Sequence, residues 1–560
     1  MSMNRREFVK GAFATGAAAT LGAALSGCSP QAPSAEGGVG STASDTEIGK
    51  HTWEVKPAPI TDVAETKDYD IVIVGAGMAG LSAAEAAARS GAKVAVLERT
   101  EEIQLHGADV GFIGSRWKKE AGEEIDVDDA CRLVYQWSQQ TANYDLIRFW
   151  FDHCGPVADY IEELVGTYDV QVVPARSKTA KGKWATLDER WRVYPSSVGF
   201  VREGDEGIWR PDKKRINYNL GEALWWNAED HEAAFFFSTH AEQLVGNAQT
   251  GITGVIAKDA NGSYVQYNAS KGVVLATGDI GGNQEMLDVW APIANRADGI
   301  VYTPEGGNTG DGILMGCWAG AACSKSPAAP MVHPFTPDSQ PFNLTAFVMS
   351  WLAVDTEGKR FCGELPFEPM LTNGRMNCAG NKAWSILDAD YATYMKQQWP
   401  ENYEALLNGL DKEMADRLEK GTFLKANTLD DLAKQLGIPA DNLKATAEQY
   451  SNMARNGRDT QFGVPSQFLS EIKTPPFYAV PLVCSVLVVP FGLHVDINSQ
   501  VCTGEDEPIP GLFAVGNVQG DFFGLSYPVH VPGLSHGRCM VFGQLVGEAL
   551  AKDTVITKLA

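Results

Sequence analysis

The residues with the clearest chemical meaning are Gly75, Gly77 and Gly80, which follow an apolar run at residues 69–74 and open an Ala-rich run. In a strand, turn and helix arrangement, the first glycine permits the tight turn, the second lets backbone approach a pyrophosphate, and the third lets helix pack on strand. The helix N-terminus favours the negative charge of the phosphates. Glu98 ends the next apolar run, where a carboxylate can accept from a ribose hydroxyl. The expected dinucleotide contacts are Gly75, Gly77, Met78, Ala79, Gly80, Glu98 and Arg99.

Strands and helices in alternation must position such a site. Apolar residues at helical spacing predict helix over residues 126–151, continuing over 157–165. Residues 176–226 are rich in Trp, Tyr, Arg and Gly without clean periodicity, which predicts loops packed near a cleft. Strands are predicted at residues 255–258, 264–267 and 272–276.

The N-terminus carries a targeting pattern. Arg5 and Arg6 form a twin-arginine motif, and the mildly apolar residues 11–25 are too short for a convincing membrane span. Residues 25–28 resemble a bacterial lipoprotein cleavage box, which places a lipid on Cys28. The alternative is a cleaved signal with an incidental cysteine.

This pattern predicts a signal peptide over residues 1–28 and, from its Ser, Ala, Gly and Pro content, a flexible linker over 29–66. Export through the twin-arginine route requires a protein that folds, with any cofactor, before it crosses. We therefore expect a protein anchored to the membrane surface outside the cytoplasm, in the periplasm or at the cell surface.

Composition narrows the partners. The net charge of -24 argues against nucleic acid or anionic lipid, and 44% hydrophobic with 21% charged residues indicates a globular chain. The ten cysteines show no CxxC pair, haem attachment or zinc spacing, so no metal, haem or iron–sulfur centre is expected. Cysteines expected in the apolar core are Cys131, Cys154, Cys317 and Cys484.

Four later blocks make a family resemblance plain. Residues 276–286 (ATGDIGGNQEM), 308–312 (NTGDG), 358–361 (GKRF) and 510–517 (PGLFAVGN) resemble, in order, blocks of the fumarate reductase and succinate dehydrogenase flavoprotein superfamily. That superfamily includes urocanate and cinnamate-type reductases and 3-ketosteroid dehydrogenases. The resemblance covers residues 69–550.

The resemblance implies FAD and an α/β fold. It implies a Rossmann-like flavin domain of the GR2 type in two pieces, residues 67–330 and 490–560, with an inserted α+β capping domain at 331–489. The active site would lie between the two domains. Further expected FAD contacts are His106, Gly107, Ala108, Asp109, Gly111, Ala276, Thr277, Gly278, Asn283, Asp311, Gly516, Asn517, Gly533 and Leu534.

His106 raises the question of covalent attachment. In membrane-bound members of the superfamily, a histidine about eight residues after the ribose-binding position carries FAD, and His106 stands eight residues after Glu98. The surrounding glycines do not match that block. We therefore expect His106 to be a loop residue near the ring and FAD to be non-covalent.

The substrate positions depart from the dicarboxylate enzymes. Eight residues beyond Arg360, where fumarate reductases carry a proton-donating arginine, this chain has Glu368. The family histidine is retained as His333, but Val488 and His530 stand where two further cationic groups are expected. Because a dianion in a dry cleft needs paired cations, these changes disfavour fumarate and succinate.

The replacements resemble 3-ketosteroid dehydrogenases, which act on neutral ring enones. Residues 475–480 and 524–528 carry this likeness, and in those enzymes a tyrosine stands at the position of Glu368. Residues 486–491, with Phe522 and Phe523, would line an apolar pocket. Packing of a core strand is the alternative for the valines of this run.

The favoured reaction is reduction of an activated carbon–carbon double bond by hydride from flavin N5 and a proton from an active-site acid. Glu368 is the first proton-transfer candidate, against a surface or ion-paired carboxylate, and Arg375 can replace the lost arginine. Tyr478 and Tyr527 are either carbonyl donors or core tyrosines, and His333 is a further donor.

Three functions stay open. The first is an exported respiratory reductase of a small, largely apolar enoate or enone, which receives electrons from a separate membrane or haem protein. The second is a ketosteroid-type dehydrogenase that forms the double bond. The third is a non-catalytic electron shuttle or ligand sensor, which His333 and Glu368 disfavour because a shuttle needs neither.

Overall fold

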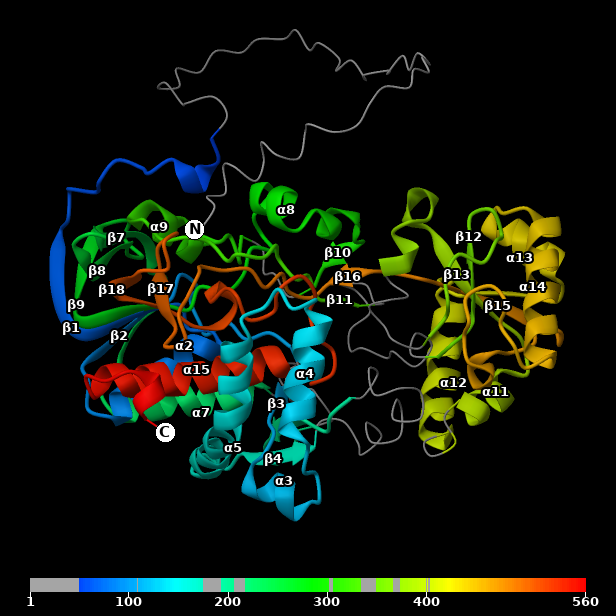
Figure 1. Ribbon diagram of the computed structural model, residues 1–560, viewed down its shortest axis with the longest axis horizontal. Helices are drawn as coiled ribbons and strands as arrows, with labels where there is room; N and C mark the ends of the chain where they lie inside the picture. The colour runs from blue at the N-terminus through cyan, green and yellow to red at the C-terminus, as the bar shows by residue number, and fades with distance from the viewer. Residues whose placement is uncertain are drawn as a thin grey trace, which may run out of the picture. The chain divides into compact units, whose positions relative to one another are not determined.

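The largest sheet joins strands from both ends of the described chain (Figure 1). Its order is β17-β18-β9-β1-β2-β6, and β7 and β8 continue it beside β9. Strands β18, β9, β1, β2 and β6 run parallel, so their carboxyl ends meet at one edge. The strands are β1 (Glu65–Val74), β2 (Val94–Leu97), β6 (Ala234–Phe236), β7 (His240–Asn247), β8 (Gly251–Lys258), β9 (Tyr264–Leu275), β17 (Gln500–Cys502) and β18 (Pro508–Ala514). The computed structural model describes residues 50–107, 109–174, 193–205, 217–301, 306–333, 349–365, 373–398, 400 and 403–559.

Helices α2 (Met78–Arg89) and α15 (Leu534–Ala551) lie side by side on this sheet, although they are far apart in the sequence (Figure 1). Glycines permit the contact: a Cβ on Gly543 would lie 2.8 Å from the Ala79 carbonyl oxygen, and one on Gly547 2.2 Å from that of Ala83. The other helices of this part are α3 (Arg116–Glu120), α4 (Val127–Trp137), α5 (Tyr144–Gly166), α7 (Asn217–Asp230), α8 (Gln284–Trp290) and α9 (Asp311–Ala319). A small antiparallel sheet contains β3 (Val110–Gly111), β5 (Ser197–Val201) and β4 (Gln171–Pro174).

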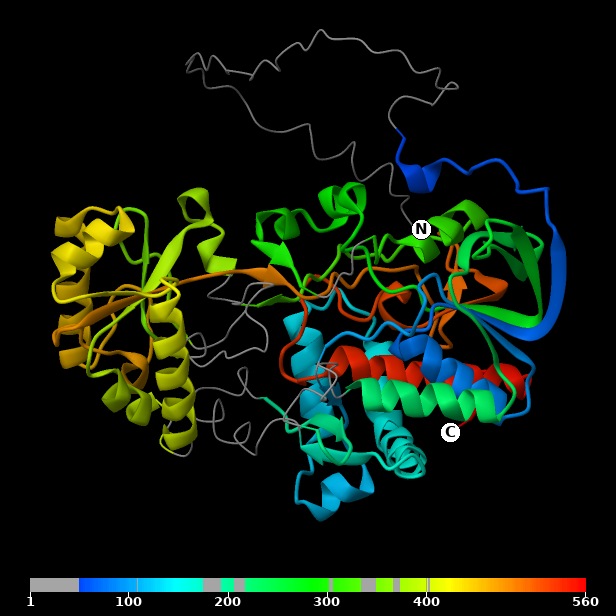
Figure 2. The ribbon, with the colours of Figure 1, turned by 180° about the vertical axis from the view of Figure 1, so that it is seen from behind.

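A second, smaller sheet has the order β12-β13-β15-β14, and all its pairs are antiparallel. Alternate residues of β15 enter two separate apolar cores, Phe477 and Ala479 one, Tyr478 and Val480 the other, so both faces of this sheet are covered. Figure 2 shows helices α11 to α14 around these strands. The elements are β12 (Leu352–Asp355), β13 (Ala383–Leu387), α11 (Tyr391–Gln398), α12 (Tyr403–Glu419), β14 (Leu424–Ala426), α13 (Leu429–Leu436), α14 (Ala440–Arg455) and β15 (Phe477–Pro481).

Three short strands, here named the crossing sheet, stand where the chain enters and leaves the smaller sheet. They are β10 (Gly299–Ile300), β11 (Val332–His333) and β16 (Ser485–Val486). Strand β16 runs parallel to β10 and antiparallel to β11, with His333 opposite Ser485. The short 3-10 helices are η1 (Thr52–Glu54), η3 (Pro292–Arg296), η4 (Ala379–Asn381), η5 (Ser466–Phe468), η6 (Gly516–Val518) and η7 (Ile556–Lys558).

The α/β class is confirmed, but three predictions of secondary structure were wrong. The helix predicted over 126–151 is two helices, α4 and α5, because Gln139 and Gln140 take positive φ between them. The strands predicted at 264–267 and 272–276 are one strand, β9, whose pairing with β1 shifts register near Gly272. Residues 217–226, predicted as loop, lie in helix α7.

The predicted linker does not extend to residue 66. Trp53 is buried in the apolar core against Trp290, and the Thr52 hydroxyl donates to Glu285 at 2.6 Å. The compact unit begins at His51, and strand β1 already begins at Glu65. In the described part of the chain, no helix combines the length and apolar character needed to cross a membrane.

Candidate active site

The glycine turn after β1 closes against the loop after β9 at the carboxyl edge of the large sheet. Gly75 has a φ of 106°, and a Cβ there would lie 2.5 Å from the Ala276 carbonyl oxygen. A Cβ on Gly80 would lie 1.9 Å from the Gly75 oxygen, and one on Gly516 2.8 Å from the Ala79 side chain. The loops after β1, β9 and β18 therefore meet where α/β folds bind nucleotides. Gly77 is the N-cap of α2, which begins at Met78.

Glu98 points across the glycine turn. Its side chain is buried, Oε2 accepts from the Ala76 N–H at 2.8 Å, and Oε1 accepts from the Thr100 N–H at 2.9 Å and hydroxyl at 2.7 Å. This orientation places a carboxylate beside the phosphate-binding turn, as a ribose contact requires.

Arg99 and Asp311 form an ion pair at the same edge, with 3.2 Å between Nη1 and Oδ2. Asp311 also lies 3.0 Å from His240 Nε2 and accepts from the Thr309 hydroxyl at 2.6 Å. Burial opposes these contacts, but together they lower the pKa of Asp311. Asp311 is therefore ionised and already has a cationic partner.

The loop after β9 holds a buried polar atom that fits a ligand. Thr277 Oγ1 is buried and has no hydrogen-bond partner among the described residues. Gly278 has a φ of 82°, and a Cβ on Gly312 would lie 2.4 Å from Thr277 Oγ1. Asn283, in contrast, caps α8 through Met286 N–H and donates to the Thr309 carbonyl. The glycine turn and the Thr277 hydroxyl together fit the dinucleotide part of FAD.

The loop containing His106 packs on the start of α15. A Cβ on Gly107 would lie 2.3 Å from His536, and the Gly111 N–H donates to the Gly533 carbonyl at 2.8 Å. Gly533 has a φ of 76° and is the N-cap of α15, which begins at Leu534. Two further predicted contacts face the protein: the His106 carbonyl accepts from Asn217, and the Asp109 carboxylate accepts from Ser197. Ala108 lies outside the described residues.

Asn517 links two buried charged groups, Arg538 and Asp279, and the partly buried Ser535. Its Oδ1 accepts from Arg538 Nη2 at 2.8 Å and from the Ser535 hydroxyl at 3.2 Å, and its Nδ2 donates to Asp279 Oδ2 at 3.5 Å. Burial raises the pKa of Asp279, although the Gly281 and Val489 N–H groups oppose this shift.

The crossing sheet brings two candidate substrate contacts together. His333 and Ser485 are both buried and directly opposite each other in an antiparallel pair, so their side chains share one face. Ser485 Oγ has no hydrogen-bond partner among the described residues. Ser485 was missed by sequence reasoning, because a lone serine in an apolar run gives no signal.

Arg375 joins this sheet from the segment before β13. Its guanidinium is 4% exposed and forms an ion pair with Asp298, 3.0 Å from Nη1 to Oδ2. Asp298 accepts from the Cys484 N–H at 2.8 Å, directly before Ser485. Nε and Nη2 of Arg375 are buried without a hydrogen-bond partner among the described residues. Burial raises the pKa of Cys484 to about 11, although the neighbouring Arg375 guanidinium opposes this shift, so the thiol stays protonated.

The two candidate tyrosines lie in different places. Tyr478 is in the middle strand pairs of the smaller sheet, edge-on to Tyr391 at 6.1 Å, in the setting of a core tyrosine. Tyr527 stacks on Phe523 at 4.7 Å, and burial raises its pKa, although Arg538 opposes this shift.

Burial lowers the pKa of His530 to about 4, so this imidazole is neutral near pH 7. Glu368 lies outside the described residues.

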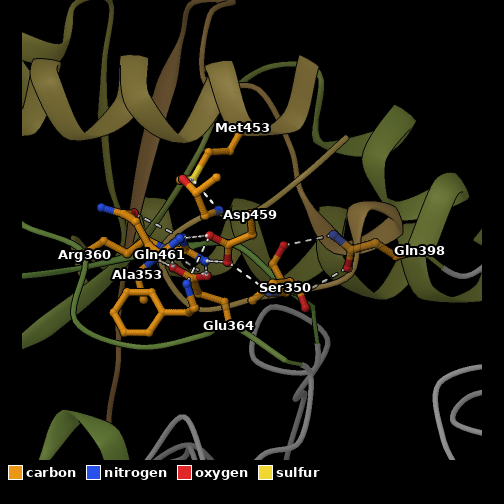
Figure 3. A network of polar contacts seen from close by, with 11 residues as sticks. Ser350, Ala353, Arg360, Glu364, Gln398, Met453, Asp459 and Gln461 are labelled. Carbon is orange, nitrogen blue, oxygen red and sulfur yellow. Dashed lines mark hydrogen bonds and ion pairs between the residues drawn. The ribbon is translucent and has the colours of Figure 1, made fainter. Parts of the chain in front are cut away.

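Arg360 of the GKRF block lies in a buried network of ion pairs and hydrogen bonds (Figure 3). Its guanidinium lies 2.6 Å from Glu364 Oε2 and 2.8 Å from Asp459 Oδ2, and all three side chains are buried. The Ala353 N–H also donates to Glu364 at 3.1 Å. This network ties the segment after β12 to the segment after α14.

Comparison with known proteins agrees with this geometry. The pattern of the family described as "FAD binding domain" matches residues 70–529. The vinyl phenol reductase of Lactiplantibacillus plantarum is 25% identical over 516 residues, covering 88% of this chain and 98% of that protein. The urocanate reductase of Eggerthella lenta is 25% identical, covering 88% and 77%. The crystal structure of a 3-ketosteroid-Δ4-(5α)-dehydrogenase from Rhodococcus jostii has a TM-score of 0.69 at 23% identity, covering 89% and 100%.

The chain belongs to the FAD binding domain family, within the fumarate reductase and succinate dehydrogenase flavoprotein superfamily, and FAD is its cofactor. It is an FAD-dependent oxidoreductase of the class that acts on CH–CH bonds.

Proposed function

We propose that the protein reduces an activated carbon–carbon double bond in a largely apolar enoate or enone with one oxygen-rich end. When bound, FAD supplies the hydride for this reaction. The named activities of similar proteins, vinyl phenol reductase and urocanate reductase, support reduction of a double bond in substrates other than fumarate.

The open edge of Arg375 is the observation that carries this proposal. Asp298 occupies Nη1, whereas Nε and Nη2 are buried without a partner among the described residues. Those two N–H groups form the side of the guanidinium that takes a carboxylate or carbonyl in a bidentate contact. Since buried donors are expensive to leave unpaired, substrate oxygen is the natural acceptor.

The residues of the crossing sheet then orient the substrate. Arg375 holds the oxygen end and withdraws charge from the double bond, which activates the β carbon. The Ser485 hydroxyl and His333, on one face of β16 and β11, can add donors to the same oxygen or orient the neighbouring carbon. From the sequence resemblance, Glu368 is proposed to protonate the α carbon.

The test is anaerobic. The purified holoprotein is reduced with an artificial dye donor and mixed with a panel of enoates and enones, and reoxidation of the flavin is followed by absorbance. Arg375→Gln should lose at least tenfold in kcat/KM with its FAD content unchanged, whereas Arg375→Lys should lose less. Equal rates for wild type and Arg375→Gln would overturn the role of Arg375.

Direction is tested in the same apparatus. If no member of the panel reoxidises the flavin but saturated ring ketones reduce it, the protein is a dehydrogenase and our proposal is wrong. If neither reaction occurs with any substrate but the flavin exchanges electrons with carriers, the shuttle interpretation replaces it.

Export and anchoring are part of the proposal. The twin arginines Arg5 and Arg6 and the cleavage box ending at Cys28 support export through the twin-arginine route and a lipid on Cys28. A separate membrane or haem protein would then supply electrons in anaerobic respiration. Cys28→Ala should release the protein from the membrane fraction, and Arg5→Lys with Arg6→Lys should retain it in the cytoplasm.

A further inference from the structure

Arg538 is a buried cation without a carboxylate partner among the described residues. It lies in the second turn of α15 and is 0% exposed. Its Nη2 donates to Asn517 Oδ1 at 2.8 Å and its Nη1 to the Gln519 carbonyl at 3.3 Å, both neutral acceptors. Nε is buried and has no hydrogen-bond partner among the described residues.

The other buried Lys and Arg side chains of the described chain differ from Arg538 in this respect. Arg360 pairs with two carboxylates, Arg375 with Asp298, and Lys118 with Glu123 at 2.7 Å. A buried charge without a counter-charge is costly, and one lost partner costs several kcal/mol. The structure thus provides an acid for each of these three cations, whereas no described residue provides one for Arg538.

Two aromatic rings favour the charge of Arg538 without neutralising it, although burial lowers the pKa of the guanidinium. The guanidinium carbon lies 4.6 Å from the centre of the Phe523 ring and 5.3 Å from that of Phe522, which favours a cation. Asp279, two hydrogen bonds away, is held off by the Asn517 amide between them.

Arg538 contacts a segment that carries predicted FAD contacts, since its Nη2 donates to Asn517. Asn517 follows Gly516, whose absent side chain admits Ala79 from the first turn of α2. Gly107 and Gly111 contact the first turn of α15, which directly precedes Arg538. One residue, Asn517, therefore connects Arg538 to the segments that carry the predicted FAD contacts.

We propose that Arg538 supplies the counter-charge for the reduced, anionic ring of bound FAD and thereby raises its reduction potential. Uptake of two electrons and one proton leaves the ring with one negative charge, and nearby protein charge tunes such a ring. A nearby cation without another counter-charge stabilises the anionic reduced cofactor more than the neutral oxidised ring. The inference rests on FAD binding alone and not on the substrate.

The first measurement needs no variant. Anaerobic titration of the wild-type holoprotein against a redox dye, repeated between pH 6.5 and 8, should give a midpoint potential that falls by about 30 mV per pH unit, as expected for two electrons and one proton. A slope of about 59 mV per pH unit means two protons and a neutral reduced ring, which overturns the proposal.

The second measurement compares Arg538→Gln and Arg538→Lys with the exposed control Arg455→Gln, which removes the same charge on α14. In Arg538→Gln, the preference of the protein for reduced over oxidised FAD should fall at least tenfold. This fall corresponds to a midpoint potential lower by about 30 mV, and Arg538→Lys should recover part of the loss. Oxidised FAD should bind within threefold of wild type. If Arg538→Gln instead loses oxidised FAD tenfold and the bound fraction keeps its potential, the counter-charge serves the pyrophosphate and the proposal is wrong.

Discussion

Asp298 forms an ion pair with Arg375 and hydrogen bonds with the backbone of Cys484, the residue directly before β16. Its carboxylate lies 3.0 Å from Arg375 Nη1 and accepts from the Cys484 N–H at 2.8 Å, while its own N–H donates to the Cys484 carbonyl at 2.6 Å. The direction in which Arg375 presents its open edge is thus fixed relative to Ser485, the next residue of the chain.

Asp298→Asn should lower kcat/KM about tenfold for the best acceptor of the panel, because the amide cannot hold the guanidinium by charge. FAD content should not change. A double-mutant cycle with Arg375→Gln identifies the route: if Asp298 acts through Arg375, the second change adds little to the first. Additive losses would mean that Asp298 acts independently.

Gly80→Ala should abolish FAD loading, because the new Cβ would lie 1.9 Å from the Gly75 carbonyl oxygen and would force apart the turn and helix α2. The ratio of flavin to protein absorbance after purification measures this loss. Gly166→Ala is the matched control: no atom lies within 4 Å of a Cβ at that position, so loading and melting temperature should stay near wild type. Normal FAD loading of Gly80→Ala would show that the turn tolerates a side chain at this position.

Arg360→Met should destabilise the protein by about 3–5 kcal/mol, because it leaves Glu364 and Asp459 buried without their cation. Urea unfolding followed by tryptophan fluorescence would show the loss. Arg455→Gln, on the exposed face of α14, should shift the curve by less than about 0.5 kcal/mol. Similar shifts for both variants would show that the network does not stabilise the folded protein.

The same network predicts a sensitivity to acid. Burial opposes the ionisation of Asp459, but hydrogen bonds from Arg360 and the N–H groups of Val464, Gln461 and Phe462 outweigh it and lower its pKa. A lowered folded-state pKa gives stability that is complete above the unfolded value and is lost as pH falls through the folded one. Asp459→Asn should therefore flatten the decline of stability below about pH 4.

His494 predicts the opposite trend at higher pH. Its ring lies 2.5 Å from Asp521 and 2.7 Å from Asp506, and the Asp521 hydrogen bond raises its pKa in spite of burial. A raised pKa gives stability that is complete below the unfolded value, about 6.5, and is lost as pH rises through the folded value. His494→Gln should thus be most destabilising near pH 6 and least near pH 9, as measured by urea unfolding. A pH-independent difference would show that the contact is not ionic.

Denaturing mass spectrometry should give the mass of the unmodified polypeptide. We expect no FAD-sized increment, since the block around His106 differs from that of the covalent enzymes. An increment located on a peptide that contains His106 would show covalent attachment.

The glycine turn between β1 and α2 could be predicted from the sequence alone, because such a turn depends on local rules. Gly75 and Gly80 lie where backbone approaches backbone, and glycine spacing reports such contacts directly. Glu98 was placed at the end of the second strand for the same reason, and its contact with a ribose stays a prediction.

The substrate side was harder to predict because it depends on pairings between distant segments. No sequence signal near Ser485 predicts that it lies opposite His333. The ion-pair partner of Arg375, Asp298, lies far earlier in the chain. Arg538 follows the same rule: its type is visible in the sequence, but its burial without an acid is a property of the fold. The single break between α4 and α5, at Gln139 and Gln140, likewise depends on a backbone conformation that helical periodicity does not record.

The pairing of β11 with β16 also bears on how this chain is assembled. Val332 opposes Val486, so the segment that leaves for the smaller sheet and the one that returns are hydrogen-bonded neighbours. Adjacent entry and exit points are what allow an inserted domain to be exchanged without breaking its host. Grafting the residues between these strands from a similar enzyme should therefore give a chimera that still loads FAD, and new substrate ranges can be sought by recombination at this junction.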